Sequence, residues 1–251
     1  MTRRIWMMAV SVALGTVACG ISLQEEPVQD EGPSATPESV EEPPAVATCS
    51  NGRVVYLHFS GLTLVRAAGG QTDAAHFKAD WLSKGGAMIP PYKAQAEPAV
   101  RAAEIAEITA AIRKTLGAFP ITVVTERPLT GRYHMVVFGG GPEALGLGSS
   151  VRKAAGHGCA NKGSNNIVWI GESFSPQDAA DYAVGGIGMG LGLSGTYATS
   201  DCLCGWGNSC VPQPGACTLS AAITNDGRCS RSPQTQNEIE AFRREFCDPL
   251  P

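Results

Sequence analysis

The first 19 residues constrain this chain most, because they determine the compartment in which the rest of it folds. Arg3 and Arg4 precede a mainly apolar run of 13 residues, Ile5 to Val17, and small residues lead from that run to Cys19. A basic start, a short apolar run and small residues before a cleavage point are typical of a secretory signal peptide. A membrane-spanning helix needs roughly 20 apolar residues, so we expect residues 1–18 to be removed during export.

The residues around the expected cleavage point also predict how the exported chain is held. Thr16-Val17-Ala18-Cys19 resembles the bacterial lipobox, in which the cysteine receives the lipid and becomes the first residue. Leucine is usual where Thr16 stands, and the alternative is an ordinary signal peptide with an incidental cysteine. The resemblance implies a lipoprotein attached through Cys19 to the membrane of the bacterial cell envelope, at the outer membrane or cell surface. Two or more acyl chains make such an anchor stable.

Residues 19–48 are predicted to form a disordered tether. From residue 21 onwards this segment has no basic residue and carries seven acidic ones, together with prolines at 27, 33, 37, 43 and 44. Low hydrophobicity and repulsion between like charges prevent such a segment from building a core.

The remaining residues, 49–251, are enough for one domain with a sizeable core. The whole chain has a net charge of −4, and the acidic tether accounts for the negative balance. Without the tether and the signal peptide the domain is close to neutral, which makes nucleic acid an improbable partner.

Eight cysteines remain after Cys19, and an even number outside the cytoplasm indicates disulfide bonds. Six of them follow residue 200, where Gly, Ser, Asn and Pro are frequent and apolar residues are few, so bridges are expected to replace burial there. A zinc site built from Cys202, Cys204 and Cys210 is the alternative, but paired C-x₂-C spacing is absent. The pairing stays open for Cys49, Cys159, Cys202, Cys204, Cys210, Cys217, Cys229 and Cys247.

The pattern of apolar residues predicts a mixed α/β domain. Strands are expected at 53–59, 121–125, 133–138 and 167–170, with the second and third adjacent across a turn at 127–131. Helices are expected at 98–117, from Ser175 onwards with serine as N-cap, and at 234–246. We therefore predict a mostly parallel, twisted sheet packed with two long helices, and a small disulfide-rich C-terminal lobe over about 197–251.

A glycine-rich stretch from Gly185 to Gly195 is the most informative motif. Read in order, it resembles the active-site segment of the metzincin zinc peptidases, H-E-x-x-H-x-x-G-x-x-H, with Gly192 at the glycine of that pattern. Three further stretches resemble the framework of metzincin-like bacterial surface proteins in the same order: residues 56–64, 89–92 and 119–128. The resemblance covers about residues 53–196 and implies a metzincin-like fold.

The residues that carry metzincin chemistry are missing from this stretch. The family holds zinc with three histidines and uses a glutamate as general base. The corresponding positions here are Gly185, Gly186, Met189 and Gly195, and a thioether is a poor zinc ligand beside imidazole. No two of the histidines are four residues apart; they are His58, His76, His134 and His157. We therefore expect no zinc, no cofactor and no catalysis by this mechanism.

Glycine is a poor helix former, so the local structure of this stretch has two interpretations. Each helical glycine costs about 1 kcal/mol relative to alanine, which packing must offset. In one interpretation residues 185–190 are helical and Met189 fills the space of the metal. In the other, residues 185–195 form an irregular loop.

These observations favour a binding or structural role for an inactive, metallopeptidase-like surface lipoprotein with a peptide or protein ligand. The alternative is a hydrolase with a rebuilt site, for which Glu172, Asp178, Asp181 and Cys204 are the candidate residues. A purely structural cell-envelope protein, spaced from its membrane by the tether, is a third interpretation.

Overall fold

The computed structural model describes residues 53–67, 71–156, 159, 165–230 and 232–247. The predicted signal peptide, Cys19, the tether, Cys49 and His157 lie outside the described residues. Contacts place the described part in one compact unit. None of the described helices is both long and apolar enough to cross a membrane.

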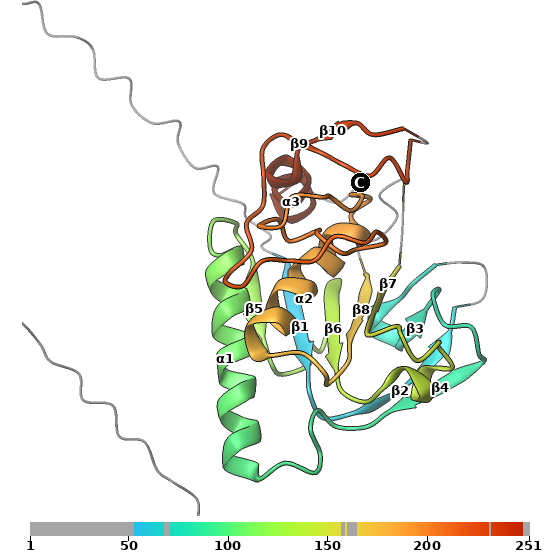
Figure 1. Cartoon of the computed structure of the whole chain (residues 1–251). Coiled ribbons are helices and arrows are strands. Elements are labelled where there is room, and N and C mark those ends of the chain that lie inside the picture. The colour runs from blue at the N-terminus through green and yellow to red at the C-terminus, as the bar shows by residue number, and fades with distance from the viewer. Residues whose placement is uncertain (1–52, 68–70, 157–158, 160–164, 231, 248–251) are drawn as a thin grey trace, which may run out of the picture. The chain divides into compact units, whose positions relative to one another are not determined.

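A five-stranded sheet forms the centre of the domain (Figure 1). Its order is β5-β1-β6-β8-β7, and the first four strands are parallel while β7 runs antiparallel at one edge. The strands are β1 (Val54–His58), β5 (Thr122–Val124), β6 (Tyr133–Phe138), β7 (Lys153–Ala155) and β8 (Ile167–Ile170). The mixed α/β class and the mostly parallel sheet are confirmed. All residues of β6 and β8 are buried, as continuous apolar runs in a parallel sheet require.

The prediction that the strands at 121–125 and 133–138 are neighbours is wrong. Strand β1 lies between them, and Val54 is level with both Thr122 and Tyr133. Because β5 is only three residues long, the connection to β6 returns a short distance before it passes to the other side of β1. The eight residues between β5 and β6 are enough to cross β1. The turn residues at 127–131 predict a change of direction, but they do not show which strand lies between the two that they connect.

Two helices cover one face of this sheet. Helix α1 (Pro98–Leu116) begins with proline at its first turn and packs through Ile108, Ile112 and Leu116. Helix α2 (Pro176–Gly190) packs beside it, and both contribute to one core cluster with alternate residues of β1, β6 and β8. The predicted starts at Pro98 and Ser175 are confirmed.

A small second sheet covers the opposite face. Its strands are β2 (Leu62–Arg66), β3 (Lys78–Ala79) and β4 (Gly86–Ile89), in the order β3-β2-β4. Leu64 and Ile89 pack there with Met135 and Trp169 of the central sheet. The chain turns between β1 and β2 at Gly61, where φ is +78° and a Cβ would lie 2.7 Å from the Pro91 nitrogen.

The C-terminal region contains little regular structure and is held by disulfide bonds, as expected. Cys202 pairs with Cys217, Cys204 with Cys210, and Cys159 with Cys229. The side chain of Cys247 lies outside the described residues. A short hairpin of β9 (Ile223–Thr224) and β10 (Thr235–Gln236) precedes helix α3 (Glu238–Cys247).

The prediction that the last helix begins at Gln234 is wrong by four residues. Thr235 and Gln236 pair with β9, and the Asn237 side chain accepts a hydrogen bond from the Glu240 amide at 2.9 Å. Asparagine is a favoured N-cap because its side-chain oxygen satisfies an amide of the first turn. The cap and the hairpin together set the start of α3.

Candidate functional site

The first part of the glycine-rich motif, Gly185 to Gly190, lies on the second half of α2, and the helix runs without interruption to Gly190. The interpretation of residues 185–195 as an irregular loop is therefore wrong for its first half. Ser175 begins the helix by accepting a hydrogen bond from the Asp178 amide, and every residue from Ala183 to Gly190 is buried. Tertiary packing offsets the poor helix propensity of the four glycines.

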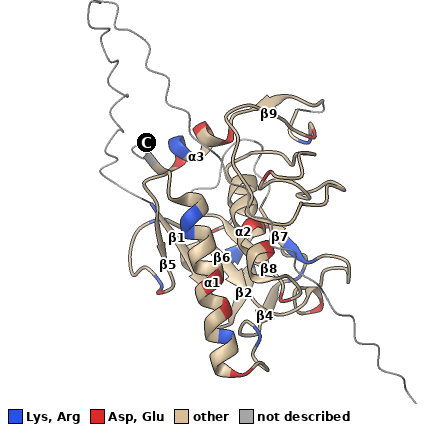
Figure 2. Ribbon diagram, turned by 60° about the vertical axis from the view of Figure 1, so that its left-hand side comes forward, with Lys and Arg blue, Asp and Glu red and all other residues tan. Residues whose placement is uncertain are grey.

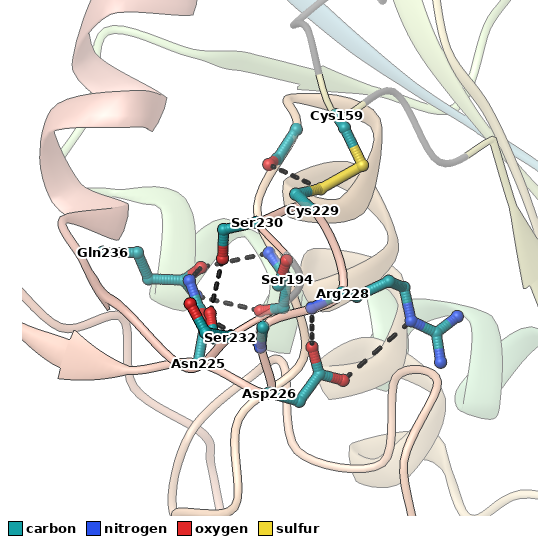
Figure 3. The surroundings of a disulfide bond; sticks show 11 residues. Cys159, Ser194, Asn225, Asp226, Arg228, Cys229, Ser230, Ser232 and Gln236 are labelled. Carbon is teal, nitrogen blue, oxygen red and sulfur yellow. Dashed lines mark hydrogen bonds and ion pairs between the residues drawn. A yellow bond between two sulfur atoms is a disulfide. The ribbon is translucent and has the colours of Figure 1, made fainter.

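After Gly190 the chain leaves the helix and turns at Gly192, where φ is +90°. The C-terminal region holds the residues that follow this turn (Figure 3). The Gln236 side chain accepts from the Ser194 amide at 3.0 Å and donates to the Ser194 carbonyl at 2.9 Å. The Asp226 amide donates to the Gly195 carbonyl at 2.7 Å. The end of the motif is thus fixed by residues more than 30 positions later in the chain.

Trp206 occupies the space beside the motif positions that lack side chains. A Cβ on Gly185 would lie 2.5 Å from the indole nitrogen of Trp206, and one on Gly186 would lie 2.9 Å from its ring. A Cβ on Gly195 would lie 2.1 Å from the Trp206 carbonyl oxygen. Met189 is buried in the same core cluster, but it is Trp206 that lies against these three glycines. The backbone therefore has no room for side chains at Gly185, Gly186 or Gly195.

The loop that carries Trp206 is closed by the Cys204–Cys210 disulfide. Asp201 supports the start of this loop by accepting from the Leu203 amide at 2.8 Å and from the Thr196 hydroxyl at 3.0 Å. Trp206 is 5% exposed. The hydrogen bonds of Asp201 and the Cys204–Cys210 disulfide therefore hold the loop that inserts the indole against α2.

Lys153 joins the edge strand β7 to this region. Its ammonium nitrogen lies 3.7 Å from the ring centre of Tyr182 on α2 and 5.4 Å from that of Trp206. Burial lowers the pKa of Lys153 to about 8, whereas the faces of the two rings favour its charged form. The lysine therefore packs as a cation between the sheet edge, α2 and the Trp206 loop.

The cysteines and histidines considered as metal ligands have other partners in the structure. Cys202, Cys204 and Cys210 are all in disulfides, so the zinc site proposed from them is wrong. His58 contacts the Tyr56 hydroxyl at 2.6 Å, His76 contacts Asp73 at 2.6 Å, and His134 contacts Glu245 at 3.3 Å. Within the described residues, no three His, Cys, Asp or Glu side chains are grouped as metal ligands.

The candidates for a rebuilt hydrolase site have structural partners. Glu172 accepts from the amides of Lys93 and Gly140 at 3.0 and 2.8 Å. Asp178 accepts from the Ser175 hydroxyl at the start of α2, and Asp181 accepts from Gln177 at 2.8 Å. Cys204 is in a disulfide. These contacts account for all four residues as parts of the framework.

A buried pair of carboxyl groups in the C-terminal region was not predicted. Glu238 is fully buried and Asp201 is 2% exposed, and the two share a hydrogen bond. Glu238 also accepts from the Ser220 amide at 2.9 Å and from Gln236 at 3.0 Å. Burial and the neighbouring Asp201 raise the pKa of Glu238 to about 8. Glu238 therefore keeps its proton at neutral pH and donates a hydrogen bond to Asp201.

This pair predicts that the domain loses stability as the pH rises from about 4.5 to about 8. An unfolded glutamate titrates near 4.5, so the folded chain holds an extra proton that it releases near pH 8. Glu238→Gln should flatten the decline, because a side-chain amide does not titrate in this pH range. Denaturant unfolding at each pH measures the effect. The exposed Glu240→Gln control should follow the parent curve, and an equal decline in Glu238→Gln would contradict the prediction.

No known protein-family model, curated protein or solved structure matches this chain. The likeness to metzincins thus depends on the order of the sequence motifs. Trp206 was not singled out in the sequence, although a lone tryptophan between two glycines in a lobe poor in apolar residues was a signal that a large side chain is buried there.

Proposed function

We propose that this chain is an exported lipoprotein of the bacterial cell envelope whose domain is an inactive, metzincin-like scaffold that binds an extended peptide. One observation carries the proposal. The motif keeps the metzincin spacing, but Trp206 fills the space beside Gly185, Gly186 and Gly195, three of the four positions where metzincins have a zinc ligand or the base. Loss of ligands alone leaves an open site. Here packing has replaced the site, which favours a scaffold that no longer needs a metal.

No described strand pairs with the outer edge of β7, and this edge is where we place the peptide. In the register of β7 with β8, the Gly171 amide donates to the Arg152 carbonyl at 2.9 Å. Hydrogen-bonded pairs alternate along antiparallel strands, so the backbone groups of Ala154 face β8 while those of Lys153 and Ala155 face away. A peptide can add to such an edge as a further strand. The small alanine side chains leave space for its backbone.

Three measurements on the purified mature chain test the proposal. Metal analysis should find far less than one zinc per chain. An array of random 12-residue peptides should retain the protein without being cleaved, and a chelator should not change this retention. One tightly held zinc per chain, or cleavage that the chelator abolishes, would overturn the proposal of an inactive scaffold.

A proline variant tests the place of binding. Ala155→Pro removes an amide that faces the outer edge and should lower peptide retention severalfold, because each lost backbone hydrogen bond weakens strand addition. Ser149→Pro is the matched control, since Ser149 is the second residue of a turn closed by the Val151 amide and the Gly148 carbonyl. Equal retention by the two variants would place the peptide elsewhere.

The anchor is tested separately. Cys19→Ser should abolish incorporation of labelled fatty acid and release the chain from the membrane fraction, because no other acylation motif is expected. Unchanged fractionation would contradict the lipoprotein assignment without bearing on the peptide site.

A further inference from the structure

A groove lies between the C-terminal turn of α1, the loop 216–219 and α3, and the proposed peptide site does not use it. Its volume is about 560 Å³, within the range of small-molecule sites. Phe119, Leu219 and Ile239 form its apolar walls, and the buried Cys217 contributes to the lining. A space of this size suits a small molecule better than a protein partner.

The walls of the groove are held in place by bonds that do not depend on a ligand. The loop is tied to the Trp206 region by the Cys202–Cys217 disulfide and by the Thr218 amide, which donates to the Ser200 carbonyl at 2.9 Å. It is tied to α3 by two reciprocal hydrogen bonds of 2.9 Å between Ser220 and Glu238. These bonds prevent the loop from closing onto α1, so the groove is formed before any ligand arrives.

Two charged residues among the described part of the chain line the groove, and both are basic. They are Lys114 of α1 and Arg243 of α3. Figure 2 shows basic residues on the neighbouring parts of α1 and α3. Arg243 contacts Glu240 at 3.2 Å, but both side chains are more than half exposed, and such exposed pairs are weak and easily exchanged. Apolar walls with a basic rim match an apolar molecule with one negative charge.

We propose that this groove binds an aliphatic carboxylate of the fatty-acid class. The hydrocarbon chain lies against Phe119, Leu219 and Ile239, and the carboxylate lies near Lys114 and Arg243. Burial of the chain provides most of the affinity, because apolar area removed from water is the main favourable contribution. The two basic side chains select the negative head group, since charge complementarity provides specificity more than affinity.

Calorimetric titration of the mature chain, produced without acyl groups, tests this with decanoate and decyltrimethylammonium. The two probes have unbranched hydrocarbon chains that differ by one carbon, and they have opposite head-group charges. Decanoate should bind at least tenfold more tightly, and added salt should reduce the difference. Lys114→Gln and Arg243→Gln should each weaken decanoate binding about threefold, as expected for exposed charge pairs.

Arg244→Gln is the matched control, because Arg244 is exposed on the same helix but does not line the groove. It should leave decanoate binding unchanged. The double charge reversal Lys114→Glu with Arg243→Glu should make the cationic probe the tighter ligand. Absence of decanoate binding, equal binding of the two probes, or an equal loss in Arg244→Gln would overturn the proposal.

Discussion

Gly185→Ala should destabilise the domain by about 3 kcal/mol, although alanine is the better helix former by about 1 kcal/mol. The added Cβ would lie 2.0 Å from the Cys202 carbonyl oxygen, far inside normal contact distance. Cys202 cannot move away easily, because its disulfide to Cys217 and the hydrogen bond that its amide donates to the Thr218 carbonyl hold it. Denaturant unfolding with the disulfides intact measures the loss.

Gly188→Ala is the matched control on the same helix. The three atoms nearest its Cβ would be side-chain carbons of Leu193, Phe242 and Leu203, at 3.3 to 3.5 Å. Small rotations relieve such contacts, and the gain in helix propensity offsets their cost. We expect stability within about 1 kcal/mol of the parent. Similar losses in the two variants would show that Gly185 is not uniquely crowded.

Trp206→Ala should cost about 3–5 kcal/mol, which is typical of removing a large buried aromatic side chain. The indole packs against Gly185 and Gly186, whose lack of side chains leaves nothing that can fill the space it vacates. The ammonium of Lys153 also loses one of its two aromatic neighbours. Unfolding by denaturant gives the magnitude.

Tyr197→Ala provides the comparison, since Tyr197 is an aromatic residue of the same lobe that is 62% exposed. Its removal should change stability by about 0.5 kcal/mol or less. A loss below about 1 kcal/mol in Trp206→Ala would mean that the indole does not hold the lobe against α2, and it would contradict the proposal that packing has replaced the site.

The crowding around the glycines also limits what engineering can restore. Replacing Gly185, Gly186 and Gly195 with the metzincin residues would introduce side chains where Trp206 and the Cys202 carbonyl now lie. Such a variant requires removal of Trp206 and movement of its loop. The C-terminal region can pack against α2 in this way only because these positions lack side chains.

Local chemistry made several elements predictable. Ser175 and Pro176 start α2, Pro98 starts α1, and the apolar runs of β6 and β8 are buried strands. Each depends on capping, proline geometry or β-branched composition, which act over a few residues. The small sheet β3-β2-β4 was missed because its strands are two to five residues long and partly exposed, and so carry little periodic signal.

The sequence by itself determined which groups the glycine-rich motif offers, because glycine and methionine at positions 185, 186, 189 and 195 provide neither an imidazole nor a carboxylate whatever the fold. It also determined that cysteines would hold the C-terminal region. Only the tertiary structure decided that the glycines form a helix, that β1 separates β5 from β6, and that Trp206 fills the space beside the motif. Side-chain identity limits ligand chemistry residue by residue, whereas contacts between residues 20 or more positions apart depend on how the whole chain packs.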